Sequence, residues 1–407
     1  MRAIEASAVD KEGFPLALKD FDKNLADAAG RDMRTLISAV LSHFGCRKTA
    51  AAHAYRTRQI LTCFGWVPVH YAYIRRAGTS ALLSAVGVVS GSTMAARDWV
   101  VRCAVLCGSF AEGRTMLRRL TSMVVSVSKL RKMALVYGEQ CLSTQNRADR
   151  DVRSYPKRVP KDGETQTART LFCMMDGTGV PCTKKDTVNT KGKHGEAGTR
   201  QIRVILFGEY EWLDKNGRPI PFKNSFFYAV SGNEIAEASG LVRKLGIARG
   251  CATATRMQCV ADGEVALENA LRDGFPNAIF TNDFMHACGY VHTCCENLGL
   301  SDEEVGKEYR FLRGLLYRCG AAAVIKRIEN RYTKALQDSQ EAEKALNYIR
   351  KRKDNMRYGK LRKAGLFIAS GHVEAAARVL VVRRCKQAGM HWRHKNAVHI
   401  SAILAHL

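Results

Sequence analysis

The stretch Leu171-Phe172-Cys173-Met174-Met175-Asp176-Gly177 decides the fold that this sequence predicts. A continuous apolar run bounded by a turn signal is typical of a strand that is buried on both faces of a sheet. Such strands occur in α/β proteins, in which helices cover the sheet. An acid at the end of a buried strand is held on a rigid frame, so Asp176 is a candidate functional residue.

The residues after this run continue the α/β pattern. Extended runs at 201–212 and 220–230 are joined by a loop that contains Asn216-Gly217, a hairpin signal. A helix is then predicted over 233–247, a strand over 256–261, a helix over 264–272 and a strand over 278–282. The order strand, strand, strand, helix, strand, helix, strand predicts a mixed sheet flanked by helices.

The part of the chain before this sheet has a different character. Residues 1–145 read as mostly helical, with a short extended piece at 58–73. Residues 146–165 are polar and charged and contain two prolines, so we expect a linker there. The predicted sheet region therefore begins near residue 166.

Composition narrows the class of protein. The chain has 407 residues, 46% of them hydrophobic, and a formal net charge of +26. It can bury sizeable cores, and its charge favours a polyanionic partner, nucleic acid before a membrane surface, over a housekeeping metabolic role. No apolar run reaches the roughly 18 residues that cross a bilayer. The first residues show no secretory signal, so we expect a cytoplasmic protein with no membrane partner.

Positive charge concentrates near the C-terminus. Residues 301–400 hold 23 Lys or Arg against 10 Asp or Glu, which is half of the net charge. A run of this kind is usually a solvated helical face. Aromatic residues are interleaved here, however, and acids nearly vanish after Asp354, which favours phosphate contact. The candidate DNA contacts are Lys351, Arg352, Lys353, Arg357, Arg383, Arg384, Lys386 and Trp392.

Acids directly follow two of the predicted strands. Asp176 follows the first and Asp262 the fourth. Carboxylates gathered at one edge of a sheet repel one another unless a cation neutralises them, and Mg²⁺ takes oxygen ligands while leaving positions open for phosphate. The alternative is that each Asp, because it precedes Gly, simply forms a turn.

Glu374 is the candidate third acid. Ser370 and Gly371 can begin a helix that places Glu374 in its first turns, and no other acid follows Asp354. A Glu near a helix start is also favourable without any ligand. The surrounding arginines favour a metal ligand beside a phosphate track. A zinc site is disfavoured, because neither the Cys103 and Cys107 pair nor the adjacent Cys294 and Cys295 has a second well-spaced pair.

Five stretches in order along the chain carry a resemblance: MMDGTGVP at 174–181, VADG at 260–263, DFMHA at 283–287, GLFIASGHVE at 365–374 and RRCKQAGMHW at 383–392. They resemble the landmarks of bacterial insertion-sequence transposases of the Kra group. The ending Arg-x-x-Lys-Gln-x-Gly-Met-x-Trp is specific. The resemblance extends from about residue 165 to the end and is weaker over 58–141. It implies a DDE-type enzyme with an RNase H-like catalytic core.

The resemblance assigns roles to individual residues. Asp176, Asp262 and Glu374 become the catalytic, metal-binding acids, and His286 becomes a helper that positions phosphate or a carboxylate. The alternative for the last element is that Asp283 caps a helix and His286 is buried. Two Mg²⁺ or Mn²⁺ ions would serve hydrolysis at the transposon end and then attack of the 3′-hydroxyl on target DNA. Asp176 would bridge both ions.

The resemblance also implies an architecture and partners. The 111 residues between Asp262 and Glu374 exceed what a core of this type requires, which predicts a basic helical insertion over 300–360. The catalytic core would then comprise 166–299 and the C-terminal helices of 361–407, and residues 1–145 would serve DNA binding or assembly. Double-stranded DNA, as transposon ends and as target, is the expected partner in the bacterial nucleoid, and the pairing of two ends implies a homo-oligomer.

The sequence departs from these relatives at one place. They carry a Cys-x-x-Cys zinc ribbon after the Gly-Trp-Val segment, whereas this chain has Tyr-Ile-Arg-Arg-Ala-Gly at 73–78. Two other hypotheses therefore stand beside the transposase: a DNA-binding protein on a catalytically inactive scaffold, and an RNase H-like nuclease that cuts but does not join DNA.

Overall fold

The computed structural model describes residues 18–46, 54–73, 83, 87–148, 161–188, 191–192, 195–196 and 198–407. The chain divides into two compact units, Met1–Gly138 and Glu139–Leu407, and each is described by itself. No helix within the described residues is long and apolar enough to span a membrane. The expected linker over 146–165 and the segment that replaces the zinc ribbon lie largely outside the described residues.

The first unit contains a small sheet as well as helices. Strands β1 (Ala54–Thr62) and β2 (Gly65–Tyr73) form an antiparallel hairpin, and the sheet order is β2-β1-β4-β3. Alternate residues of β2 are buried, which gives the hairpin one apolar face. The sequence analysis anticipated only a short extended piece here. The other elements of this unit are α2 (Leu18–Gly45), β3 (Val88–Val89), β4 (Ser92–Thr93), α4 (Met94–Leu106), α5 (Phe110–Leu120) and α6 (Val127–Arg147).

A mixed sheet forms the centre of the second unit. Its order is β10-β8-β5-β11-β12, in which β5, β8 and β10 are antiparallel neighbours and β11 and β12 run parallel to β5. The short strand β9 (Pro219–Pro221) adds to β8. The sheet strands are β5 (Thr165–Pro181), β8 (Thr199–Leu213), β10 (Phe227–Ser231), β11 (Arg256–Ala261) and β12 (Ile279–Asn282). The second unit is therefore an α/β structure, as predicted.

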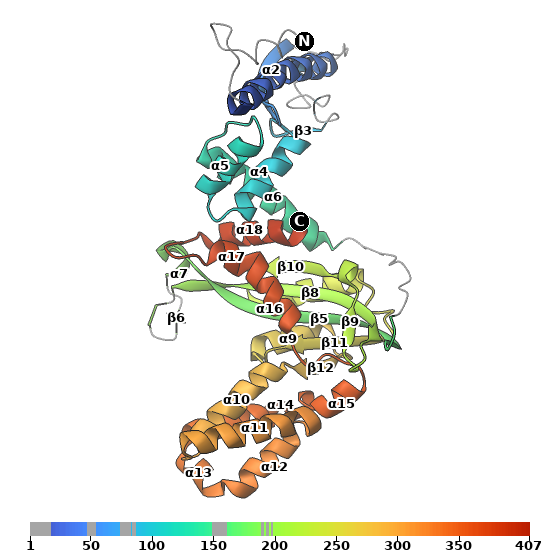
Figure 1. Ribbon diagram of the computed structural model, residues 1–407, viewed down its shortest axis with the longest axis vertical. Coiled ribbons are helices and arrows are strands. Elements are labelled where there is room, and N and C mark those ends of the chain that lie inside the picture. The colour runs from blue at the N-terminus through green and yellow to red at the C-terminus, as the bar shows by residue number, and fades with distance from the viewer. Residues whose placement is uncertain are drawn as a thin grey trace. The chain divides into compact units, whose positions relative to one another are not determined.

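Both faces of this sheet are covered, which explains the continuous apolar run at 171–175. Cys173 and Met175 face a core shared with α8 (Ile235–Ala248) and α9 (Val265–Gly274). On the opposite face, the rings of Phe172 and Tyr210 contact that of Phe367 at 5.0 and 5.2 Å between centroids. Helix α16 (Gly371–Ala377) crosses this second face (Figure 1).

The predicted insertion over 300–360 is helical. Its helices pack with α10 (Phe284–Glu296) around an apolar core of their own, and they form the bundle below the sheet in Figure 1. Buried Leu312, Leu316, Ile328 and Leu346 contribute to that core. The elements are α11 (Asp302–Cys319), α12 (Ala321–Arg331), α13 (Thr333–Asp338), α14 (Gln340–Arg352), η2 (Lys353–Asn355) and α15 (Tyr358–Lys363).

The C-terminal segment returns to the sheet. Helix α16 continues through the π-helical turn η3 (Arg378–Val382) into α17 (Arg383–Cys385), and α18 (His394–His406) follows. The N–H of Trp392 donates to the carbonyl of Pro181 at 2.9 Å, and Trp392 pairs with Cys182 in an isolated parallel bridge. The remaining short elements are α7 (Lys184–Thr187), β6 (Lys191–Gly192), β7 (Gly195–Glu196) and η1 (Lys223–Ser225).

Two predicted boundaries in the sheet are wrong. Strand β5 does not end at Asp176, because 177–181 continue to pair with 199–203 of β8. The extended run predicted over 220–230 is interrupted by η1, so it forms β9 and β10 instead of one strand. In contrast, β11 has the predicted bounds.

Candidate functional site

The register of the sheet places two of the predicted acids side by side. Met175 of β5 is paired with Ala261 of the parallel strand β11, so Asp176 and Asp262 occupy the next position on neighbouring strands. Ala261 is in turn paired with Asn282 of β12, which brings Asp283 to the following place in the same row. Three aspartates thus lie along one line across three parallel strands.

The predicted third acid comes from the helix on the face of the sheet. Ser370 precedes the first residue of α16, and Glu374 lies in the first turn, as the sequence predicts. This helix packs against β5 and β8 through its small residues, including buried Ala376 and Ala377. Glu374 itself is exposed. The side chain is therefore free to accept a ligand at the edge of the acidic row.

The electrostatics join these acids into one group. Partial burial and, after it, the negative charges of Asp262 and Glu374 together raise the pKa of Asp176 to about 6, against the opposing effects of the Gly177 N–H and His286. Like-charged neighbours make the ionised form of a carboxyl group unfavourable. The three predicted acids therefore act on one another, and a cation placed among them would relieve the repulsion.

Asp283 is the best-connected acid of the site, and the sequence analysis gave it no catalytic role. Its side chain is 1% exposed, and Oδ1 accepts from the backbone N–H of His286 at 2.7 Å and lies 3.1 Å from His286 Nδ1. Oδ2 accepts from the N–H and the hydroxyl of Ser370 at 2.7 and 3.0 Å. Burial acts to raise the pKa of Asp283, but these hydrogen bonds outweigh it and hold the pKa below its ordinary value.

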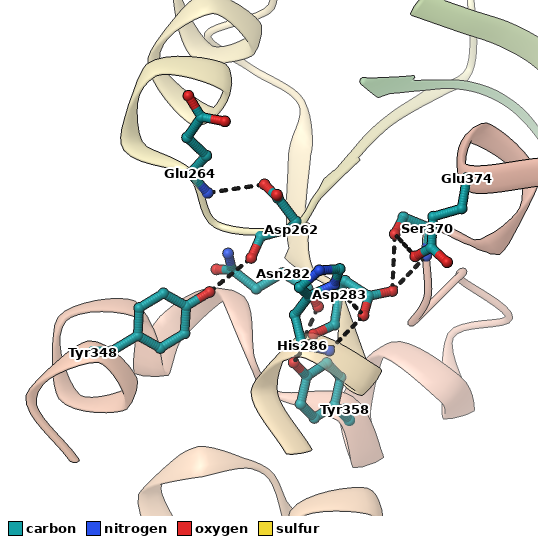
Figure 2. A network of polar contacts seen from close by, with 9 residues as sticks. All are labelled: Asp262, Glu264, Asn282, Asp283, His286, Tyr348, Tyr358, Ser370 and Glu374. Atoms are coloured by element: carbon teal, nitrogen blue, oxygen red, sulfur yellow. Dashed lines mark hydrogen bonds and ion pairs between the residues drawn. The ribbon is translucent and has the colours of Figure 1, made fainter. Parts of the chain in front are cut away.

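Ser370 links Asp283 to the third acid, as Figure 2 shows. Its hydroxyl lies 2.9 Å from Glu374 Oε1 as well as 3.0 Å from Asp283 Oδ2. A hydroxyl group has a single proton, so it donates to one of these two carboxylates at a time. Asp283 therefore fixes the start of α16 and, through Ser370, the side chain of Glu374.

The expected alternatives for Asp283 and His286 can now be separated. Asp283 does cap α10, because it accepts from the backbone N–H of His286 in the first turn. His286, however, is not buried, since its side chain is 46% exposed. The hydrogen bond to Asp283 and the nearby acids raise the pKa of His286. The imidazole is thus oriented by a buried carboxylate and open to a ligand.

Two sets of side chains could hold a metal ion. Within the described residues, the ligand atoms of Asp283, His286 and Glu374 all lie within 4.8 Å of one another. Asp283 is a poor ligand in this set, because both of its oxygens already face donor groups. Asp176, Asp262 and Glu374 also offer oxygen ligands of the type that Mg²⁺ prefers, but within the described residues they do not form a set whose ligand atoms all lie within 4.8 Å of one another.

Two tyrosines from the helical region over 300–360 donate hydrogen bonds to backbone carbonyls at or next to two of the aspartates. The hydroxyl of Tyr348 donates to the carbonyl of Asp262 at 2.7 Å, and that of Tyr358 to the carbonyl of Asn282 at 3.0 Å (Figure 2). Gly263 follows Asp262 with φ +88°, and a Cβ atom there would lie 2.0 Å from the Tyr348 hydroxyl. Only glycine fits this turn. In the sequence, Tyr348 stands out only as an aromatic residue beside a basic run.

The predicted DNA contacts divide into two groups. Arg384 and Trp392 are only 3% and 9% exposed, and the guanidinium of Arg384 lies 5.3 Å from the Trp392 ring centroid. The side chain of Arg352 is 10% exposed, lies over the Tyr348 ring and pairs with Glu268 at 3.5 Å. These three side chains pack against their neighbours, and their assignment as phosphate contacts stays a prediction. The exposed members are Lys351, Lys353, Arg357, Arg383 and Lys386.

Two of the cavities in the second unit differ in whether a candidate acid lines them. The larger, about 900 Å³, lies among β10, α8 and α18, and no candidate acid lines it. A smaller cavity of about 410 Å³ is lined by His286 and Glu374 together with residues of α10. The smaller cavity is the one that opens on the candidate site.

Comparison with protein-family models and with curated proteins finds no match to this chain.

The raised pKa of Asp176 predicts a pH-dependent stability. The folded protein binds this proton more tightly than the unfolded chain, so the free energy of unfolding falls as the pH rises from about 4 to about 6. In buffer without divalent cations, Asp176→Asn should therefore stabilise the protein at pH 7 by roughly 1–2 kcal/mol, allowing for solvent screening. The gain should vanish near pH 4. Denaturant unfolding at both pH values measures it, with exposed Asp273→Asn as control, and equal stability of variant and wild type at pH 7 would contradict the interpretation.

The contacts of Asp283 predict an unusually costly substitution. Asp283→Ala removes the cap of α10 and leaves the buried N–H of Ser370 without its acceptor, which should lower the free energy of unfolding by about 2–4 kcal/mol. Asp283→Asn keeps one acceptor but turns an amide NH₂ toward donor groups, so it should also destabilise. Urea unfolding measures both. An Asn variant as stable as the wild type would show that the two oxygens do not act together.

Proposed function

We propose that this protein is a DDE-type DNA transposase, which hydrolyses a phosphodiester at a transposon end and then joins that end to target DNA. The observation that carries the proposal is the shared register of Asp176 and Asp262 on neighbouring parallel strands, with Glu374 near enough to raise the pKa of Asp176. The same three residues are the acids that the resemblance to Kra-group transposases assigns.

The topology of the sheet supports the finer fold that the proposal requires. Three antiparallel strands come first along the chain, two parallel strands follow on the other side of β5, and helices connect them. This arrangement is the one expected of an RNase H-like core. The helical elements between β12 and α16 correspond to the insertion that the resemblance implies. The proposal therefore agrees with the order, the direction and the connections of the strands.

Divalent cations complete the proposed centre. Asp176, Asp262 and Glu374 would hold Mg²⁺ or Mn²⁺, which supplies an activated water and stabilises the leaving oxygen of the phosphodiester. The charges of both other acids raise the pKa of Asp176. The resemblance to Kra-group transposases would make Asp176 the carboxylate shared by the two ions.

The chain's own residues orient this centre. Asp283 fixes the His286 ring on one side and the start of α16 on the other, so the third acid is held by a buried anchor. Exposed His286 can then donate a hydrogen bond to a phosphate oxygen beside the acids. Tyr348 holds the backbone of Asp262. The side chains that would contact DNA are thus positioned by Asp283 and Tyr348, which would not contact it themselves.

The charge of the chain supports DNA as the substrate. The net charge is +26, and Lys351, Lys353 and Arg383 are exposed on elements of the second unit. Lys386 contacts Thr178, two residues beyond Asp176, with Nζ 3.3 Å from the Thr hydroxyl. Phosphate contacts of this kind position a duplex and do not read its sequence. Recognition of two ends at once would require a homo-oligomer.

A cleavage and joining assay tests the proposal. The purified chain, given Mg²⁺ and DNA from the element that encodes it, should nick the element ends and join them to a target plasmid. Asp176→Asn, Asp262→Asn and Glu374→Gln should each lower both products by at least about 100-fold, since the metal ligands act as a unit. Glu264→Gln, a change in the neighbouring acid outside the group, is the matched control.

The outcomes separate the three hypotheses. Nicked DNA without any joined product would indicate a nuclease. DNA binding with neither product, unchanged by Asp176→Asn, would indicate an inactive scaffold. Loss of activity in the Glu264→Gln variant equal to that in Asp262→Asn would contradict the assignment of these particular acids.

A further inference from the structure

Helix α10 presents one face to an open groove beside the proposed acids. Residues on this face recur at intervals of three and four, as one side of a helix requires. Together with Glu374 of α16 they line a cavity of about 410 Å³. The groove is therefore bounded by His286 and Glu374, two residues of the proposed centre. Its remaining lining residues are Met285, Gly289, Tyr290 and Thr293.

Apolar side chains lie open to solvent along this groove. Met285 is 56% exposed and Tyr290 is 38% exposed. An exposed ring beside charged groups is a surface on which a nucleobase can stack, whatever its sequence. Since the neighbouring acids are proposed to cut a phosphodiester, the ligand that would bring a flat ring to this place is the DNA strand itself.

The aromatic surface is rigid. The rings of Tyr290 and Tyr348 are stacked, with centroids 3.5 Å apart and an interplanar angle of 10°. The guanidinium of Arg352 lies 4.2 Å from the centroid of Tyr348, whose hydroxyl donates to the carbonyl of Asp262 at 2.7 Å. The stack thus fixes Tyr290 relative to the second acid. A base stacked on Tyr290 would be held at a defined place beside the reacting phosphate.

Gly289 keeps the groove open. It lies in the middle of α10, where glycine is less favourable than alanine. A Cβ atom at this position would meet no atom within 4 Å, so the position faces open space. Alanine would fit there without a clash, whereas a larger side chain would occupy the space beside Tyr290.

We propose that this groove binds an unpaired nucleobase of the strand that is cut, stacked on Tyr290 next to His286 and Glu374. The inference rests on the proposed function and adds a base-binding subsite to it. It also requires that base pairing open beside the scissile phosphate, because a base inside a duplex cannot reach a ring in a groove.

A binding experiment tests the subsite apart from catalysis. The probe is a short single-stranded DNA of mixed sequence that carries 2-aminopurine, in buffer with EDTA, and the same sequence as a duplex is measured in parallel. Tyr290→Ala should weaken single-strand binding roughly 5- to 100-fold, the range of one lost stacking contact, and should change duplex binding less than about twofold. The salt dependence should stay the same, because no cation is removed.

Three further variants control the experiment. Gly289→Leu fills the groove without touching the ring, so it should weaken single-strand binding in the same way. Tyr290→Trp keeps a stacking surface and should bind as well as the wild type or better. Phe311→Ala removes an exposed aromatic side chain of α11 outside the groove and should change nothing.

The outcomes distinguish this inference from the function on which it rests. If the wild type binds DNA, but Tyr290→Ala and Gly289→Leu bind single strands as it does, the subsite is wrong and the transposase proposal stands. If the wild type binds neither single strands nor duplex, the proposed function itself is contradicted, and the subsite with it. Equal weakening of single-strand and duplex binding by both variants would also overturn the subsite.

Discussion

The hydrogen bonds accepted by Asp283 are the constraint on which the candidate site depends. This carboxylate is 1% exposed and meets donor groups of His286 and Ser370, so it joins the end of β12, the start of α10 and the start of α16. A buried carboxylate without donors would be strongly destabilising. Because the network satisfies it completely, the positions of His286 and Glu374 follow from that of a residue that no ligand would touch.

The pKa of Asp176, beside this network, is shifted in the opposite direction to that of Asp283. Asp283 is stabilised in its charged form, whereas burial and its neighbours raise the pKa of Asp176 to about 6. Two aspartates at the two ends of one row across three strands thus differ in role, one structural and one proposed to bind a cation. Placing partly buried carboxyl groups of like charge close together lowers local stability, and such unfavourable arrangements are typical of functional sites.

The helical region over 300–360 supports the site by hydrogen bonds to its backbone. Tyr348 and Tyr358 hold the carbonyls of Asp262 and Asn282, and the stack of Tyr348 on Tyr290 continues this support to the groove. The insertion is therefore part of the frame of the site, in addition to any contact that its exposed lysines make with DNA. A DNA duplex bound to those lysines would lie on helices that also fix the loop of the second acid.

The sequence predicted most of the sheet, because apolar runs and Asp-Gly turn signals are local, whereas the joint role of the three acids stays a prediction. The bounds of β11 were predicted correctly, and the start of α16 at Ser370 followed from its small polar residues. The continuation of β5 beyond Asp176 was missed, since it depends on pairing with β8.

The support of the site could not be found in this way. Tyr348 acts on a carbonyl 86 residues away, and Ser370 acts on a carboxylate 87 residues away. Nor does residue type reveal burial: Arg384 and Trp392 resemble DNA contacts in the sequence but pack against one another. Contacts between residues this far apart in the sequence can be identified only in the folded chain.

The most direct test of the central claim is the position of a divalent cation. A crystal of the protein soaked in Mn²⁺ should show anomalous density among the carboxylates of Asp176, Asp262 and Glu374, with the hydrogen bonds of Asp283 unchanged. The absence of a peak at these carboxylates at saturating Mn²⁺, or a peak coordinated by Asp283 in place of Asp176, would contradict the account.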